Sequence, residues 1–209
     1  MKIKNIIFDL GGVIITLDQS NAVARFKEIG LEDAERRLDP YTQSDIFGDL
    51  EKGKISADEF CSALASIIGK PVSYEQCKFA WLGYCKELPA RNLDMITRLR
   101  SKGYRIILLS NTNPFMMDWA MSAEFDGRGH SLAYYMDAMY MSYKCGMMKP
   151  DERLFRHVIE AEGIVPGETL FVDDGPRNVE VAAQLGINTF CPGNGDDWAG
   201  DILRILEQE

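Results

Sequence analysis

Polar side chains follow several apolar segments of this chain, at the points where those segments end. In chain order they are Asp9, Ser110 with Asn111, Lys149, and Asp173 with Asp174. Adjacent carboxylates directly after an apolar strand repel one another unless a cation lies with them. Mg²⁺ prefers one or two carboxylates together with water and phosphate oxygens. Asp9 and Asp174 would supply such a metal site, with Asp173 close by.

The segment Ser110-Asn111-Thr112-Asn113-Pro114 has the residue types of an anion site. Pro114 suits the first turn of a helix, and Asn113 suits its N-cap. The hydroxyl and amide groups of Ser110 and Asn111 would then donate hydrogen bonds beside exposed helix amides. Lys149, just before a proline, can place its ammonium at the same strand ends. Each cluster taken alone also fits ordinary helix capping or a solvated surface.

The elements that must position these residues alternate between helix and strand from Ala90 onward, which indicates a parallel α/β sheet. We expect strands over 3–8, 104–109, 138–142, 169–172 and 187–191, and helices over 93–101, 151–162, 178–185 and 198–207, with 114–137 helical in part. In such folds ligands bind at the carboxyl ends of the strands. The polar clusters are therefore predicted to meet at one edge of the sheet.

The segment 16–88 lacks a convincing strand, and its apolar residues recur at helical spacing. We expect helices over 21–29, 31–38, 45–52, 56–69 and 73–85. Ser56 and Glu59 have the spacing of a capping box. We therefore predict an α/β core domain of residues 1–15 and 89–209 and an inserted helical cap of residues 16–88. The cap would shield a pocket at the strand ends from water.

Composition restricts the cellular context and the partners of the 209-residue chain. No apolar run approaches the roughly 20 residues of a membrane-spanning helix. Met1-Lys2 lead directly into the first strand, and the five cysteines form no C-x-x-C pair. We expect a cytoplasmic protein with reduced thiols and no membrane partner. The net charge of −9 argues against nucleic acid but permits a small anionic substrate beside a metal or lysine. A monomer and a homodimer both remain open.

Four motifs occur in a characteristic order: Phe8-Asp9-Leu10-Gly11-Gly12-Val13, Leu109-Ser110-Asn111-Thr112, Lys149-Pro150-Asp151 and Phe171-Val172-Asp173-Asp174. On these motifs the chain resembles the haloacid dehalogenase (HAD) superfamily, in the branch whose helical cap follows the first strand. Within that branch it is similar to small sugar-phosphate phosphatases of the glucose-1-phosphate phosphatase type. The resemblance implies a Rossmann-like α/β core with an inserted α-helical cap.

The resemblance also implies roles for the clustered residues. Asp9 would be the nucleophile that forms an aspartyl-phosphate, and Lys149 would compensate the charge of nucleophile and phosphate. Mg²⁺ would be held by Asp9, the carbonyl of Gly11 and Asp174, with Asp173 as a further or water-mediated ligand. Ser110 and Asn111 would bind phosphoryl oxygens. The expected substrate is a small phosphorylated metabolite, such as a sugar phosphate.

Gly11 departs from the family pattern, because phosphatases of this superfamily usually carry there a second Asp that acts as acid and base. Such a group typically contributes about 10²–10⁴-fold to the rate. Three interpretations follow. The protein could be a phosphatase in which another acid, such as Asp18, replaces the missing Asp. It could also be a phosphatase whose substrate, such as a sugar 1-phosphate, has a good leaving group. In either case Gly11 and Asp18 would contact the substrate. It could instead be a dehalogenase, or a phosphate- or partner-binding protein without activity.

Overall fold

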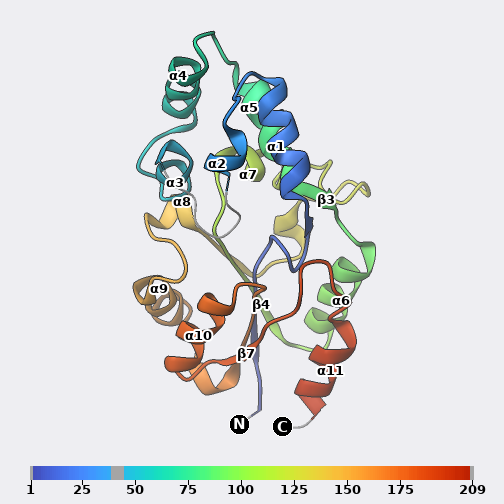
Figure 1. Cartoon of the computed structure of the whole chain (residues 1–209). Helices are drawn as coiled ribbons and strands as arrows, with labels where there is room; N and C mark the ends of the chain where they lie inside the picture. The colour runs from blue at the N-terminus through green and yellow to red at the C-terminus, as the bar shows by residue number, and fades with distance from the viewer. Residues whose placement is uncertain (1, 39–44, 208–209) are drawn as a thin grey trace.

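The computed structural model describes residues 2–38 and 45–207, and a parallel five-stranded sheet lies at its centre (Figure 1). The sheet order is β5-β4-β1-β6-β7, and every neighbouring pair runs parallel. The strands are β1 (Asn5–Phe8), β4 (Arg105–Ser110), β5 (Ala138–Met141), β6 (Thr169–Val172) and β7 (Asn188–Phe190). The predicted parallel α/β core is therefore confirmed.

Helices cover both faces of this sheet (Figure 1). Side chains alternate across each strand, so Ile6 and Phe8 pack in one apolar cluster while Ile7 packs in another. The first cluster includes buried residues of α6 (Ala90–Ser101) and α11 (Ala199–Glu207), and the second includes residues of α9 (Glu152–Glu162) and α10 (Pro176–Gln184). Two short helices complete the core: α7 (Pro114–Ala120) and α8 (Ser142–Cys145).

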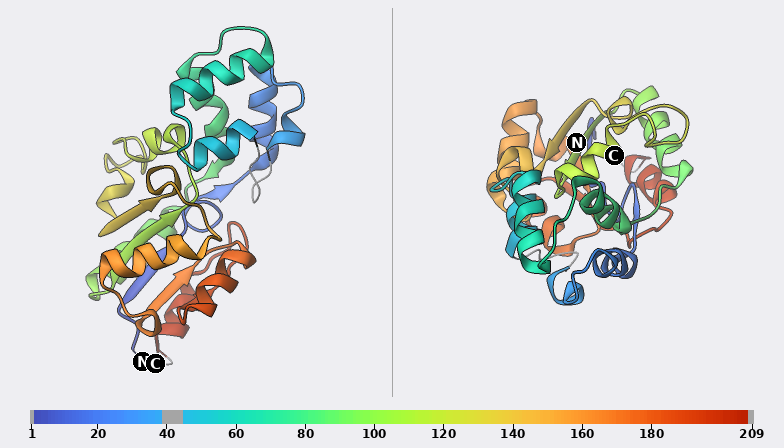
Figure 2. Two further views of the ribbon diagram at one scale, coloured as in Figure 1. Left: turned by 90° about the vertical axis from the view of Figure 1, so that its left-hand side faces the viewer. Right: turned by 90° about the horizontal axis from the view of Figure 1, so that it is seen from above.

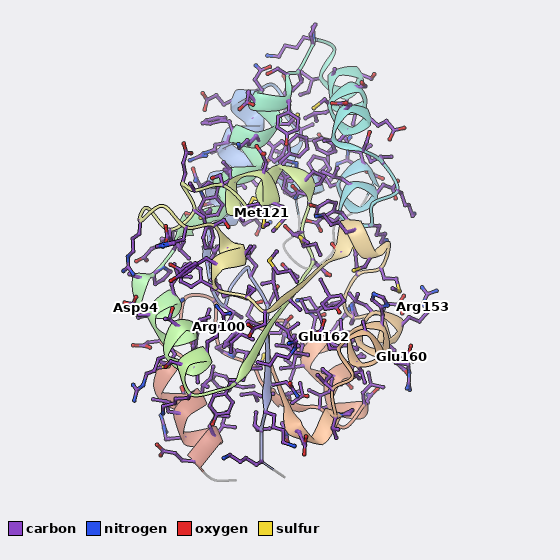
Figure 3. All side chains as sticks on the ribbon, turned by 180° about the vertical axis from the view of Figure 1, so that it is seen from behind. Asp94, Arg100, Met121, Arg153, Glu160 and Glu162 are labelled. Carbon is purple, nitrogen blue, oxygen red and sulfur yellow. The ribbon has the colours of Figure 1, made fainter. Side chains whose placement is uncertain are left out.

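Polar contacts tie the flanking helices to the sheet. Glu162, at the end of α9, accepts hydrogen bonds from Arg105 (2.9 Å) and from the Tyr140 hydroxyl (2.6 Å). Arg100 of α6 donates to Asp137 just before β5 (2.7 Å). Figure 3 shows Arg100 and Glu162 on different helices flanking the sheet. These contacts fix the helices that frame the sheet.

The remaining helices gather at one end of the molecule, beyond the carboxyl ends of the strands (Figure 2). They are α1 (Gln19–Glu28), α2 (Ala34–Arg37), α3 (Asp45–Glu51), α4 (Ala57–Ile68) and α5 (Tyr74–Trp81). Their core is a cluster of packed aromatic rings that includes Phe26, Phe47, Phe60 and Trp81. The predicted capping box of Ser56 and Glu59 is present at the start of α4.

Two short strands at the junction contradict the prediction that 16–88 is free of strands. β2 (Thr16–Leu17) pairs antiparallel with β3 (Cys85–Glu87). Strands this short cannot display the alternation that identifies a strand in a sequence. Phe115 and Met116 of α7 also pack into the aromatic cluster formed by helices α1 to α5.

The division into a core of 1–15 and 89–209 and a cap of 16–88 remains a proposal. The β2–β3 pair lies where the chain enters and leaves the proposed cap. Residues 1, 39–44 and 208–209 of these proposed units lie outside the described residues. Within the described part of the chain, no helix combines the length and the apolar character that crossing a membrane requires.

Candidate active site

The order of the strands brings the predicted residues to one edge of the sheet. β1 lies between β4 and β6, and Phe8 is in register with both Leu108 and Val172. The chain passes from β1 to β4 and β5 on one side, and then crosses to β6 and β7 on the other. Such a reversal of strand order opens a crevice at the carboxyl ends of the strands. Asp9 is the first residue after β1 at that point.

Lys149 lies at the centre of the cluster. Its side chain is fully buried, and its ammonium lies 3.0 Å from Asp9 Oδ1 and 2.5 Å from Asp173 Oδ2. It also donates to the carbonyl oxygen of Leu109 at 2.8 Å. The three hydrogens of the ammonium therefore have three acceptors. This buried cation is positioned to balance negative charge on Asp9 and on a bound anion.

Asp173 holds Lys149 in place. Its Oδ1 accepts hydrogen bonds from the backbone N–H of Gly175 (2.8 Å) and from Asn178 Nδ2 (2.9 Å), while its Oδ2 accepts from Lys149. Both carboxylate oxygens are thus engaged by the protein. This geometry suits a positioning role better than direct metal ligation.

Asn111 also acts on Lys149. Its side-chain amide donates to the carbonyl oxygen of Lys149 and accepts from the N–H of the same residue, both at 2.9 Å. Ser110, the last residue of β4, is 2% exposed, and its hydroxyl lies 3.4 Å from the carbonyl oxygen of Asn111. That distance is long for a hydrogen bond between oxygens. The Ser110 hydroxyl is therefore the better placed of the two side chains to bind a phosphoryl oxygen.

The carboxylates of Asp9 and Asp174, with Asp173 beside them, form a group that fits Mg²⁺. One oxygen from each residue lies within 4.8 Å of the others. The donors are hard oxygens, which Mg²⁺ prefers, and two carboxylates plus a carbonyl leave room for water and a phosphate. The structure thus brings together Asp9, Gly11, Ser110, Asn111, Lys149, Asp173 and Asp174, and the roles assigned to them from the sequence stay predictions.

The ionisation of the cluster reflects its burial. Burial raises the pKa of Asp9 to about 7, against the opposing charge of Lys149. Burial and the neighbouring Asp173 raise the pKa of Asp174 to about 6. Burial opposes the charge on Lys149, but Asp173 and Asp9 outweigh it and raise the pKa of the ammonium. Burial and the neighbouring carboxylates therefore disfavour the ionised forms of Asp9 and Asp174 in the metal-free site.

These pKa values predict how Mg²⁺ stabilises the protein as pH changes. Asp9 ionises near 3.8 when unfolded and near 7 when folded, so the folded state binds more protons in that window and loses stability as pH rises. A divalent cation competes with those protons. We expect the Mg²⁺-induced rise in Tm to be larger at about pH 8 than at about pH 5 in differential scanning fluorimetry. Equal shifts at both pH values would contradict this account.

Gly12 makes room for the Asp174 carboxylate. Its φ is +75°, and a Cβ at this position would lie 2.0 Å from Asp174 Oδ2. We expect Gly12→Ala to displace that carboxylate, abolish the Mg²⁺-induced rise in Tm and lower stability by about 1–3 kcal/mol. Gly69→Ala is the matched control, because Gly69 has φ +79° with no neighbour within 4 Å. Gly69→Ala should show only the loss of stability caused by a non-glycine residue at positive φ, and it should keep the Mg²⁺-induced rise in Tm.

A cavity of about 80 Å³ lies beside the carboxylate cluster, between the strand ends and the helices of the proposed cap. Leu10 and Gly11, the residues after Asp9, line it from the core side, as do residues 110–113. Glu51, Trp81 and Tyr84 line it from the cap side. Sequence reasoning missed Glu51, since an acid at the end of a helix carries no signal of burial. Trp81 and Tyr84 were recognisable only as apolar members of a helix.

Asp18 lies outside this set. It is the N-cap of α1, where its carboxylate accepts from the Ser20 hydroxyl (2.5 Å) and the Asn21 N–H (3.1 Å). These bonds, that from Ser20 first, hold its pKa below the usual range. It does not line the cavity. A helix cap with a lowered pKa is poorly suited to donate a proton, so we do not assign Asp18 to the site.

Comparison with known proteins agrees with this geometry. The model of the haloacid dehalogenase-like hydrolases matches residues 3–186 of the chain. The chain belongs to this family. The HAD resemblance and the HAD-like fold expected from the four motifs are thereby confirmed.

Individual relatives extend over nearly the whole HAD-like chain. A D-ribitol-5-phosphate phosphatase of Bacteroides thetaiotaomicron is 48% identical over 98% of both chains. A solved HAD-like family hydrolase from Porphyromonas gingivalis is 44% identical and superposes with a TM-score of 0.95 over 100% of both chains. A variant of a HAD family enzyme from B. thetaiotaomicron, in complex with magnesium and inorganic phosphate, is 37% identical with a TM-score of 0.90, covering 96% of this chain and 98% of its own.

Proposed function

We propose that this HAD-family hydrolase is a Mg²⁺-dependent phosphatase that transfers the phosphoryl group of a small phosphorylated sugar or polyol to Asp9 and then to water. The observation that carries the proposal is the buried contact of Lys149 with Asp9 and Asp173, with Asp174 beside them. The acidic group favours this chemistry over C–halogen hydrolysis, which requires no metal.

In this proposal each residue has a distinct task. A carboxylate oxygen of Asp9 attacks phosphorus, and the bond from phosphorus to the ester oxygen breaks as the aspartyl-phosphate forms. The departing alkoxide takes its proton from water, because Gly11 supplies no acid. A second water then attacks phosphorus, which releases inorganic phosphate and restores Asp9. Lys149 stabilises the charge that Asp9 and the phosphoryl oxygens share, and Ser110 donates to a phosphoryl oxygen. Asp173 and Asn111 hold Lys149 in position. Asp9, Asp174 and the carbonyl of Gly11 would hold Mg²⁺, which supplies positive charge against the phosphoryl group.

The relatives support the choice of substrate class. The B. thetaiotaomicron relative is named for D-ribitol 5-phosphate, and the related enzyme solved with magnesium holds inorganic phosphate. The cavity beside Gly11, of about 80 Å³, lies next to the phosphoryl site, where the leaving alcohol would bind. We therefore propose a phosphorylated polyol or sugar as the substrate. A cytoplasmic location, and the lack of nucleic-acid and membrane partners, remain predictions, and so does the choice between monomer and homodimer.

The test is phosphate release from a panel of esters. D-Ribitol 5-phosphate, D-ribose 5-phosphate, glucose 1-phosphate, a nucleoside monophosphate and p-nitrophenyl phosphate would be incubated with Mg²⁺ or with EDTA. We expect Mg²⁺-dependent release, fastest with a polyol or sugar phosphate. Failure to release phosphate from every ester, with Mg²⁺ still raising Tm, would point to a binding protein instead.

A further inference from the structure

The cavity beside the phosphoryl site is lined by buried polar groups that the chemistry on phosphorus does not use, and two of them, Trp81 and Glu51, stand out. Trp81 and Glu51 both reach it from the proposed cap. They belong to different helices, α5 and α3, and each is the last residue of its helix. Much of the remaining lining is apolar and includes Leu10, Ile15, Leu17 and Met116. The cavity therefore combines these apolar residues with the polar groups of Trp81 and Glu51.

Trp81 carries an unpaired donor. Its side chain is 1% exposed, yet its Nε1 atom has no hydrogen-bond partner among the residues that the structure describes. The rings of Phe26 and Phe47 pack against the indole with centroids 5.6 and 5.7 Å away, which fixes its orientation. Buried indole N–H groups usually have a partner. Because Trp81 also lines the cavity, a ligand bound there is the candidate partner for this N–H.

Glu51 carries a carboxyl group that pairs with no charged side chain among the described residues. It is 8% exposed, and its hydrogen-bonding neighbour is the side chain of Asn113, the N-cap of α7. Burial raises the pKa of Glu51 to about 7, and the bond to Asn113 offsets only part of that effect. A buried carboxyl group of this kind retains capacity to accept hydrogen bonds.

We propose that Trp81 and Glu51 form a hydroxyl-binding subsite for the alcohol half of the phosphate ester. Trp81 Nε1–H donates to one substrate hydroxyl oxygen, and the Glu51 carboxyl accepts from a substrate hydroxyl. This inference rests on the proposed phosphatase function and adds the residues that select its leaving group.

The chemistry of the lining favours neutral hydroxyl groups over other ligands. A hydroxyl both donates and accepts, so it satisfies an N–H and a carboxyl at once. Among the described residues that line the cavity there is no lysine or arginine to bind a second phosphate, and Glu51 would repel one. A polyol chain without further charge therefore fits this subsite better than a bisphosphate or a nucleotide.

A kinetic test compares two esters that differ in hydroxyl content. Trp81→Phe removes the N–H and keeps an aromatic ring, and Glu51→Met removes both acceptor oxygens while keeping the length of the side chain. Each variant should lower kcat/KM for D-ribitol 5-phosphate about 10-fold, as expected when one hydrogen bond to a buried group is lost. Turnover of p-nitrophenyl phosphate, which has no such hydroxyls, should stay within about twofold. Equal losses on both esters, or no loss on either, would overturn the proposal.

Matched control variants come from the same helical region. Phe79 is 40% exposed, and Glu75 is exposed on α5; neither lines the cavity. Phe79→Leu and Glu75→Met should leave kcat/KM for both esters unchanged. Tm measured for all four variants separates a loss of folding from a loss of recognition.

A direct readout does not depend on turnover. In Asp9→Asn protein labelled with ¹⁵N, the Trp81 indole N–H resonance would be assigned by its absence from Trp81→Phe and followed during titration with D-ribitol 5-phosphate. We expect a downfield shift as the N–H gains an acceptor, whereas an unmoved resonance at saturation would overturn the subsite. If the parent enzyme hydrolyses no ester, the phosphatase proposal fails, and this resonance still reports whether the alcohol binds at Trp81.

Discussion

Asp9→Asn is expected to lower phosphate release by about 10⁴-fold or more, because an amide cannot replace the carboxylate as nucleophile. The substitution keeps the size of the side chain. Lys149 retains its contacts with Asp173 and with the carbonyl oxygen of Leu109. The measurement is Mg²⁺-dependent phosphate release from the best ester of the panel, at saturating substrate.

Stability provides the control for this variant. Burial raises the pKa of Asp9 to about 7, so ionising it costs free energy in the metal-free protein. Asparagine carries no charge, and the Tm of the metal-free variant should equal or exceed that of the parent at about pH 8. Substantial remaining turnover in a folded Asp9→Asn protein would contradict the assignment of Asp9 as the nucleophile.

Lys149→Met is expected to lower both stability and activity. The lysine is 3% exposed and contacts two carboxylates, so its removal leaves Asp9 and Asp173 buried without a counter-ion. Breaking one partner out of a buried ion pair costs about 3–5 kcal/mol. We expect that loss in urea unfolding, together with a fall in phosphate release of about 10²-fold or more.

An exposed lysine gives the matched comparison for Lys149. Lys144, on α8, is exposed and forms no salt bridge with a described residue. Lys144→Met should change the free energy of unfolding by less than about 0.5 kcal/mol and leave phosphate release unaltered. Similar effects of the two substitutions would show that Lys149 does not hold the site together.

The core of the site could be predicted from sequence because parallel strands align their carboxyl ends. Asp9 follows β1 and Asp173 follows β6, and those strands are neighbours in the sheet. The helix–strand alternation that defines the sheet is a strong periodic signal. Residues at successive strand ends therefore meet whatever the details of packing.

The parts that sequence did not predict depend on tertiary packing. The side-chain amide of Asn111 forms two hydrogen bonds with the backbone of Lys149, 38 positions away in the chain. No local sequence pattern indicates that partner, so the sequence could not show that this amide is already occupied. Glu51 and Trp81 occupy ordinary helical positions. Only the folded arrangement shows that the carboxyl is buried and that the indole N–H has no partner among the described residues. The short β2–β3 pair lies below the length at which alternation is visible.

The central claim is that the phosphoryl group passes through Asp9. The most direct test is to mix the enzyme with Mg²⁺ and its best ester, quench in acid and reduce with borohydride. Borohydride converts an aspartyl-phosphate to homoserine, which peptide mass spectrometry locates. We expect homoserine at position 9 in the parent and none in Asp9→Asn. Rapid phosphate release without homoserine at position 9, under conditions that trap a known aspartyl-phosphate, would contradict the account.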